Sequence, residues 1–197
     1  MKQFITVLIW VLLVAGCSKK VENDSTSQPT ATDLGKDANY FSNLYGPANS
    51  QKRVSEYDFS LPSVGHLIKL NDHFVIQQYV GGKLSVTVIF SETSPQAIWV
   101  KYTLPNSWTQ EQIKAALGAY DNKWTATNQN TGVASVGAAV MKSLMPDQTP
   151  STFQSNSGIL ACKTMVNELM FYSPALYQNL RQKVADEEQL KRAVPKF

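Results

Sequence analysis

His66 and His73 are the only histidines in the sequence, and Asp72 precedes the second of them. Imidazole and carboxylate groups could ligate zinc or act as general bases, but a zinc site needs three or four converging ligands. No third ligand stands near this pair, which flanks a turn-like Asn71-Asp72. We therefore predict no metal site, no bound cofactor and no catalytic residue here, and expect ordinary surface or half-buried histidines.

Cys162 is the second side chain that could do chemistry, and it lies in a short apolar run typical of a strand. A nucleophilic thiol needs a nearby base and a lowered pKa, and nothing adjacent in the sequence supplies either. We expect Cys162 to be a small buried hydrophobe. The sequence also contains no GxSxG, HExxH, P-loop or CxxC motif. Distant pairing leaves the question of an enzyme open, but a non-enzymatic role is favoured.

Three tryptophans, Trp99, Trp108 and Trp124, follow the N-terminal region, with Tyr102 and Tyr120 close to them in sequence. Such aromatic side chains could line a groove for a peptide or a glycan. Aromatic residues at strand and helix-start positions more often belong to the core, and Trp108 at a helix start would then be half exposed. Both interpretations stay open.

The N-terminus has the layout of an export signal. Lys2 supplies a positive charge, and residues 4–13 are apolar apart from Thr6. A helix needs roughly twenty apolar residues to cross a bilayer, so this segment is too short to be a membrane span. We predict a signal peptide that is removed.

Val14-Ala15-Gly16-Cys17 ends this segment and resembles the lipobox of bacterial lipoprotein signal peptides. The resemblance implies that residues 1–16 are cleaved off and that Cys17, the new first residue, is acylated on its thiol and its amino group. Two or more acyl chains hold a protein stably on a bilayer. Ser18, where an Asp would signal inner-membrane retention, implies the outer membrane, with the protein facing the periplasm.

Removal of residues 1–16 leaves 181 of the 197 residues and takes away Lys2, which lowers the formal charge from +3 to +2. The basic residues are dispersed, so nothing indicates a nucleic-acid partner. Residues 17–36 are rich in Ser, Thr, Asp and Asn and cannot bury enough surface to fold. We predict a flexible tether over 17–36 and a single domain over 37–197.

Alternation of apolar and polar residues is clearest between positions 74 and 102. Residues 74–79 and 84–90 alternate with period two, and Gly81-Gly82 between them is a turn signal. Residues 96–102 supply a third run rich in Ile, Trp, Val and Tyr. We predict an antiparallel meander of three strands.

Helix signals lie on both sides of the meander. Asp37 can cap a short helix that runs through Tyr45 and ends at Gly46-Pro47. After the meander, Thr109 and Gln112 form a capping box, which predicts a second helix over the following ten residues. Residues between the first helix and about Leu67 carry no regular signal, and we expect a loop or an irregular strand there.

The C-terminal third begins with an ambiguous stretch, residues 127–150, for which we expect a surface helix or a mobile loop. Short strands follow at 152–154, 159–163 and 168–172, and Trp124 opens another. Ser173-Pro174 places an N-cap before a proline at the first helical position. The terminal amphipathic helix reaches about Ala193, and its distal half carries few apolar residues.

These elements predict an α+β domain, in which antiparallel meander sheets are covered by helices. The order of short helix, Gly-Pro break and three-strand meander on a lipidated chain is similar to the small outer-membrane assembly lipoproteins of the SmpA/OmlA type. This similarity covers residues 37–103, rests on layout, and carries no site residues with it.

Two functions from different classes remain open. The first is an interaction or structural module of the cell envelope, attached to the membrane through its lipid and holding an envelope protein. The second is a ligand-binding or hydrolytic envelope protein with an aromatic-lined pocket. The absence of a visible catalytic motif favours the first.

Overall fold

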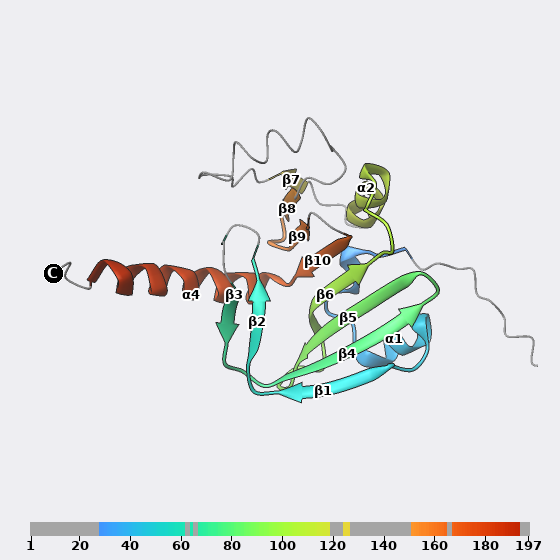
Figure 1. Ribbon diagram of the computed structural model, residues 1–197, viewed down its shortest axis with the longest axis horizontal. Coiled ribbons are helices and arrows are strands. Elements are labelled where there is room, and N and C mark those ends of the chain that lie inside the picture. The colour runs from blue at the N-terminus through green and yellow to red at the C-terminus, as the bar shows by residue number, and fades with distance from the viewer. Residues whose placement is uncertain are drawn as a thin grey trace, which may run out of the picture.

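The computed structural model describes residues 28–61, 64, 67–118, 124–126, 151–164 and 167–193. They form an α+β domain, with helices packed on both sides of an antiparallel sheet (Figure 1). The helices are η1 (Ala31–Asp33), α1 (Ala38–Tyr45), α2 (Gln110–Gly118) and α4 (Pro174–Ala193).

The main sheet has eight strands. In spatial order they are β1 (Ser50–Val54), β4 (Phe74–Gly81), β5 (Leu84–Ser91), β6 (Ala97–Thr103), β10 (Glu168–Tyr172), β9 (Leu160–Lys163), β8 (Ser151–Ser155) and β7 (Trp124–Ala126). A separate hairpin pairs β2 (Tyr57–Ser60) with β3 (Leu67–Leu70). The three strands of the predicted meander and the four later strands are confirmed, and they join in one sheet where β6 pairs with β10.

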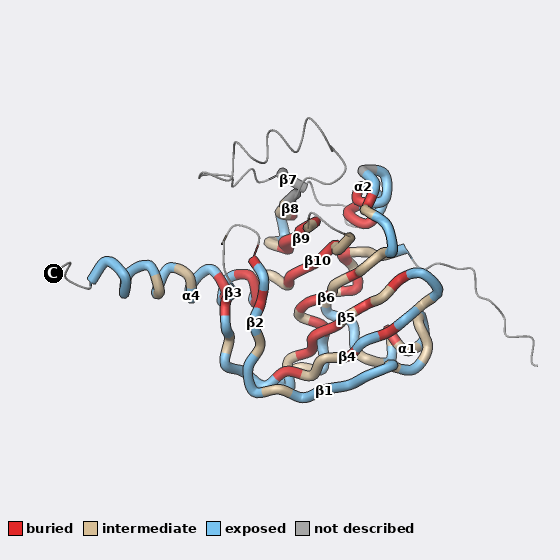
Figure 2. The backbone as a smooth tube through the Cα atoms, viewed as in Figure 1, coloured by how far each residue is buried: buried red, intermediate tan, exposed pale blue. Residues whose placement is uncertain are grey.

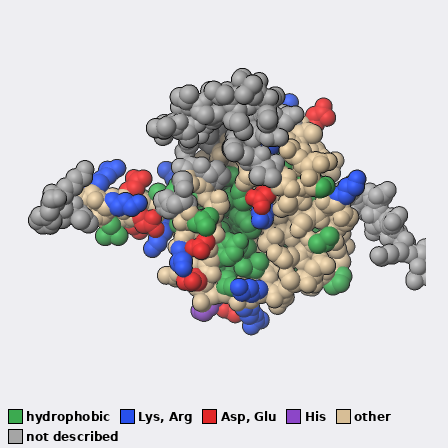
Figure 3. Space-filling model, viewed as in Figure 1, with side chains coloured by type: hydrophobic (Ala, Val, Ile, Leu, Met, Phe, Trp, Pro, Cys, Tyr) green, Lys and Arg blue, Asp and Glu red, His purple; other side chains and the backbone are tan. Residues whose placement is uncertain are grey.

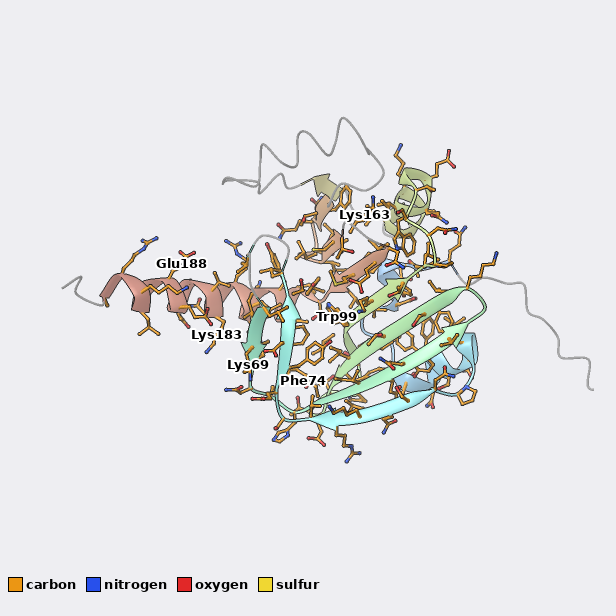
Figure 4. The ribbon with its side chains drawn as sticks, in the orientation of Figure 1. Lys69, Phe74, Trp99, Lys163, Lys183 and Glu188 are labelled. Atoms are coloured by element: carbon orange, nitrogen blue, oxygen red, sulfur yellow. The ribbon has the colours of Figure 1, made fainter. Side chains whose placement is uncertain are left out.

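The sheet separates two hydrophobic cores. One core lies under η1, α1 and α2, and it contains Phe41, Tyr102, Trp108 and Phe171. The other lies under the hairpin β2–β3 and the first turns of α4. Figure 4 shows two of its side chains, Phe74 and Trp99, between the hairpin and the main sheet.

Helix starts follow the sequence signals closely. Asp37 caps α1 by accepting a hydrogen bond from the Tyr40 backbone N–H at 2.9 Å. Thr109 and Gln112 form the reciprocal capping box ahead of α2, with distances of 3.0 and 3.2 Å. At α4, the Ser173 hydroxyl accepts from the backbone N–H of Leu176 at 3.3 Å.

The folded domain begins before the predicted end of the tether. Ala31 and Asp33 are 0% and 1% exposed, and two backbone hydrogen bonds join this segment to the start of β6: Gly35 N–H to Ala97 C=O and Ala97 N–H to Lys36 C=O, at 2.9 and 2.8 Å. Residues 30–36 are therefore part of the fold, contrary to the expectation of a tether that extends to residue 36.

The region between α1 and the meander also differs from expectation. It contains β1 at the sheet edge and β2, which pairs with β3, where we expected a loop or an irregular strand up to about Leu67. β1 is polar and exposed along most of its length, so apolar alternation, the usual signal of a strand, is missing. Residues 1–27 and 127–150, with the predicted signal peptide, Cys17 and the ambiguous stretch, lie outside the described residues.

Candidate functional site

An apolar cavity of about 270 Å³ opens beside the first described residues of the chain. We call it the N-terminal cavity; it is lined by Gln28, Pro29, Lys83, Leu84, Leu104, Trp108, Gln112 and Ala115. The Trp108 indole N–H donates to the Asn167 carbonyl at 2.8 Å, and the Asn167 amide N–H in turn donates to the Leu104 carbonyl. The polar edge of Trp108 is therefore satisfied away from the cavity.

The tryptophans singled out in the sequence do not share one groove. Trp99 belongs to the core under the hairpin, whereas Trp108 belongs to the core on the opposite side of the sheet. They are 3% and 2% exposed. Trp124 opens β7 as expected, but its side chain lies outside what the structure describes. Trp108 borders the N-terminal cavity.

A second cavity, of about 340 Å³, has a polar rim and lies between the start of α1 and the sheet edge. Asp37, Arg53 and Glu92 contribute charge to it, while Val75 and Phe90 are apolar members of its lining. Arg53 Nη1 lies 3.9 Å from Glu92 Oε1. Its charged side chains are exposed to solvent, so their attraction is weak.

His73 lies next to this polar cavity, with its Nδ1 3.7 Å from Glu92 Oε2. A hydrolytic site would need a nucleophile within hydrogen-bond reach of the base. The two hydroxyls adjacent in sequence to Glu92, those of Ser91 and Thr93, are instead hydrogen-bonded to each other at 2.8 Å. His73 thus forms an exposed pair with a carboxylate rather than a catalytic relay. His66 lies outside the described residues.

The most deeply buried carboxylate of the described chain is Asp33. Its two oxygens accept hydrogen bonds from the Tyr102 hydroxyl and, at 2.8 Å, from the Tyr40 hydroxyl. Desolvation raises the pKa of Asp33, against the opposing effect of the two phenol hydrogen bonds and of Lys36. Burial, followed by the charge of Asp33, raises the pKa of Tyr102 as well. This cluster, the Asp33 clasp, attaches the start of the domain to α1 and β6.

Sequence reasoning missed the Asp33 clasp because residues 17–36 have the composition of a tether. One signal was present, since Thr30 and Asp33 have the spacing of a helix-start motif. The Thr30 hydroxyl does accept from the Thr32 backbone N–H at the start of η1. The motif fixes a local turn, but it does not reveal that Tyr102, 69 residues further along the chain, donates to the same carboxylate.

Part of the hairpin side of the sheet is polar and open. Lys101 Nζ and Glu168 Oε1 form an ion pair of 2.9 Å across β6 and β10, and both side chains are partly exposed.

In Figure 3 hydrophobic side chains gather at the centre of the molecule, and few charged groups lie to their right. The exposed Val80, at 55%, is on β4.

β9 carries two buried side chains of reactive types, Cys162 and Lys163. Cys162 is fully buried, as the sequence predicted, and desolvation raises the pKa of its thiol far above the ordinary value. Lys163 is 0% exposed, an unusual burial for a lysine. Lys163 does interact with another group of the protein. Figure 4 shows it on the side of the molecule near α2.

Helix α4 extends far beyond its packing contacts. Leu176, Tyr177 and Leu180 are buried and Val184 is partly buried, whereas most of residues 185–193 are exposed (Figure 2). We call residues 185–193 the distal half of α4. Leu190, in this half, is 68% exposed. Lys183 and Glu188 point away from the domain (Figure 4).

Among the described residues, no three His, Cys, Asp or Glu side chains gather as metal ligands would. None of the helices in the described ranges is both long enough and apolar enough to span a bilayer.

Comparisons with known proteins give the chain no family. No protein-family model matches it, and neither a curated protein nor a solved structure is significantly similar to it.

Proposed function

We propose that this protein is a lipid-anchored interaction module of the bacterial cell envelope. Acylated Cys17 holds it to the outer membrane on the periplasmic side, and the folded domain presents the distal half of α4 to an envelope protein. The observation that carries this proposal is the length of α4 that leaves the domain without packing against it.

The two ends of the domain differ in a way that suits this role. The first described residues lie beside α2, and the C-terminal end of α4 lies at the opposite end of the long axis (Figure 1). A lipid at Cys17 would keep the α2 end close to the bilayer, because only ten residues separate Cys17 from Gln28. A flexible segment of that length spans on the order of 20 Å. The distal half of α4 would then point away from the anchored end.

The distal half of α4 is a self-supporting helix. Gln182 Nε2 donates to Asp186 Oδ1 at 2.8 Å, and Arg192 Nη2 lies 3.7 Å from Glu188 Oε2. The positive charges of Lys191 and Arg192 in the last turn interact favourably with the negative, C-terminal end of the helix dipole. At 1.5 Å per residue, the nine residues add roughly 14 Å of helix. A partner could therefore bind a surface that is already ordered.

A ligand-binding protein is the second candidate, and the N-terminal cavity favours it. This cavity retains one aromatic residue of the proposed pocket, Trp108. Its volume of about 270 Å³ lies near the lower end of the range for small-molecule sites, about 300 to 1,000 Å³. Such a site would accept a small or slender ligand.

Site-specific crosslinking in the native host tests the interaction module. A photoreactive residue replaces Gln189 on the distal half of α4, and in a matched strain it replaces Asn43, an exposed residue of α1. We expect a discrete adduct with one envelope protein from position 189, no such adduct from position 43, and loss of the adduct in a Cys17→Ser chain. Mass spectrometry identifies the captured protein.

Equal labelling from both positions would mean that the contact is not made by α4. Lack of any adduct from position 189, while the protein floats with outer-membrane vesicles, would contradict the module and favour the ligand-binding candidate. Flotation of the wild type but not of Cys17→Ser tests the lipid anchor separately.

A further inference from the structure

The N-terminal cavity has the chemistry of a site for an alkyl chain. Leu84, Leu104, Trp108 and Ala115 present apolar surface to it. The polar atoms of this wall are engaged elsewhere, since the indole N–H of Trp108 donates to Asn167 and the Leu104 carbonyl accepts from the Asn167 amide. A polar ligand would find few partners on this wall, whereas a hydrocarbon needs none.

The rim of the cavity is different from its wall. Gln28, Lys83 and Gln112 are the polar residues of its lining, and all three are exposed to solvent. Lys83 is the one charged residue among those that line the cavity. Lys83 follows Gly82 in the β4–β5 turn, where Gly82 adopts a φ of +59°. Lysine binds phosphate and carboxylate groups as a compact cation. An apolar wall with one cation at its mouth matches a chain that ends in an anionic or phosphate-bearing head.

The size of the cavity limits the occupant. At about 270 Å³ it lies just below the range of typical ligand sites. It is therefore too small for a complete diacyl lipid and suits part of a single chain. Each methylene moved out of water contributes about 0.8 kcal/mol, so even a partly inserted chain would bind measurably.

Position along the chain indicates where this hydrocarbon comes from. Gln28 and Pro29 border the cavity and are the first described residues after the tether. Ten residues lie between Cys17 and Gln28, and a flexible linker of that length spans on the order of 20 Å. The mouth of the cavity is thus within reach of the bilayer surface. The proximity of the cavity to the bilayer rests on the lipid anchor of the proposed function. The match between the cavity and an alkyl chain does not depend on that anchor.

We propose that the N-terminal cavity holds one acyl chain of a membrane phospholipid, with the headgroup beside Lys83. The bound chain fixes the orientation of the domain, which a lipid at Cys17 alone would leave free. The α2 end then faces the bilayer, and α4 extends away from it.

Quenching of Trp108 fluorescence by a brominated acyl chain tests the proposal, because bromine quenches an indole only near contact. The first probe is a lysophosphatidylcholine brominated near the middle of its chain, added to purified Cys17→Ser chain, which has no lipid of its own. We expect saturable quenching that is absent in Trp108→Phe, which identifies the quenched residue. Trp99 lies on the other side of the sheet and serves as an internal unquenched control.

Two matched substitutions establish where the probe binds. Ala115→Phe places a ring at an exposed helix position that lines the cavity, and Ala185→Phe places the same ring on the distal half of α4. We expect at least about tenfold weaker probe binding in Ala115→Phe, because the ring displaces roughly two methylenes. Ala185→Phe should bind as the wild type does. Equal affinity in the two variants, or no quenching in the wild type, would overturn the acyl-chain site.

The second probe is a vesicle of phosphatidylethanolamine and phosphatidylglycerol with brominated chains, carrying the lipidated wild type. Quenching of Trp108 there supports a bilayer lipid as the source. Quenching by the lysolipid but not in vesicles with which the protein floats would overturn the bilayer source. Failure to float would instead count against the anchor, so failure of the proposed function can be told apart from failure of the cavity.

Discussion

Residues 30–36 and the distal half of α4 lie at opposite ends of the domain and are held in place by different means. Residues 30–36 form one short turn, yet Ala31 and Asp33 are buried and the segment is hydrogen-bonded to α1 and β6. The distal half of α4 is regular and long, but its interactions are mostly within the helix itself. How firmly each segment is attached to the domain therefore depends on how many of its atoms are buried, and not on how regular its secondary structure is. Substitutions at the two ends should differ accordingly.

Loss of the Asp33 carboxylate should give the largest effect. Asp33→Ala leaves the buried Tyr102 hydroxyl without its acceptor, and the partly exposed Tyr40 hydroxyl can turn to water. An unsatisfied buried polar group costs roughly 1 to 3 kcal/mol. With the cavity left by the missing side chain, we expect a loss of about 3 kcal/mol in the free energy of unfolding, measured by urea denaturation.

Asp186→Ala is the matched control for this substitution. Asp186 lies on the distal half of α4 and is exposed, so its removal should change the free energy of unfolding by less than about 0.5 kcal/mol. Similar losses in the two variants would mean that the Asp33 clasp does not anchor the segment.

The pH dependence of stability sharpens the same contrast. Because burial raises the pKa of Asp33, the folded chain holds this proton more tightly than the unfolded chain does. The contribution of Asp33 to the free energy of unfolding is fully present below the ordinary carboxyl pKa of 3.8. It declines as pH rises through the higher pKa of the folded state. Asp33→Asn removes the titration and keeps an oxygen that can accept from one tyrosine.

We therefore expect the difference in unfolding free energy, wild type minus Asp33→Asn, to fall as pH rises from about 4 to about 7. The fall should be smaller than the loss in Asp33→Ala. Urea denaturation across this range measures it. Parallel curves for the two proteins would show that the carboxyl of Asp33 does not titrate in the folded chain within that range.

The contrast between the two ends also explains how far the sequence could predict the structure. Local signals were sufficient for α1, α2 and α4, because Asp37, Thr109 and Ser173 each accept a hydrogen bond from a backbone N–H three residues away. The meander was visible because its strands alternate and its turn contains Gly81-Gly82. β10 was visible as an apolar run. These predictions depend on neighbours in the chain.

Features that depend on distant partners were not predictable. The pairing of β6 with β10 joins segments about seventy residues apart, and nothing in either strand specifies the other. The polar strand β1 is recognisable only by its partner, β4. The N-terminal cavity requires Pro29, Lys83 and Trp108 to meet. Trp108 was singled out for its type, but its companions were not.

The start of α4 should be moderately sensitive to substitution. Ser173 caps the helix through Leu176, and its own backbone N–H donates to the Ile98 carbonyl at 2.9 Å. Loss of an N-cap hydroxyl typically costs about 1 kcal/mol, so Ser173→Ala should lower the free energy of unfolding by about that amount. Gln189→Ala on the distal half is the control and should change it by less than about 0.5 kcal/mol. Equal effects would indicate that α4 is equally coupled to the domain along its length.

Removal of residues 186–197 should have the smallest effect on stability and the largest on the proposed interaction. The buried contacts of α4 end at Leu180, with Val184 as its last partly buried apolar side chain. The ion pair and hydrogen bond of the distal half contribute about 0.2 to 0.5 kcal/mol each to the helix alone. We expect the urea midpoint of the truncated chain to match that of the full chain closely. Circular dichroism should lose only the helical signal of the removed turns.

The same truncation separates the role of the distal half from that of the domain. A photoreactive residue at Lys183, which the truncation retains, should capture the envelope partner in the full chain and not in the shortened one. A drop in unfolding free energy above about 1 kcal/mol would place buried contacts in residues 186–197 and contradict the comparison between the two ends. Unchanged capture by the stable, shortened chain would move the binding surface to the proximal turns of α4. Since those turns share a hydrophobic core with Phe59 and Ile68 of the hairpin β2–β3 and with Met170, the partner would then also contact the hairpin.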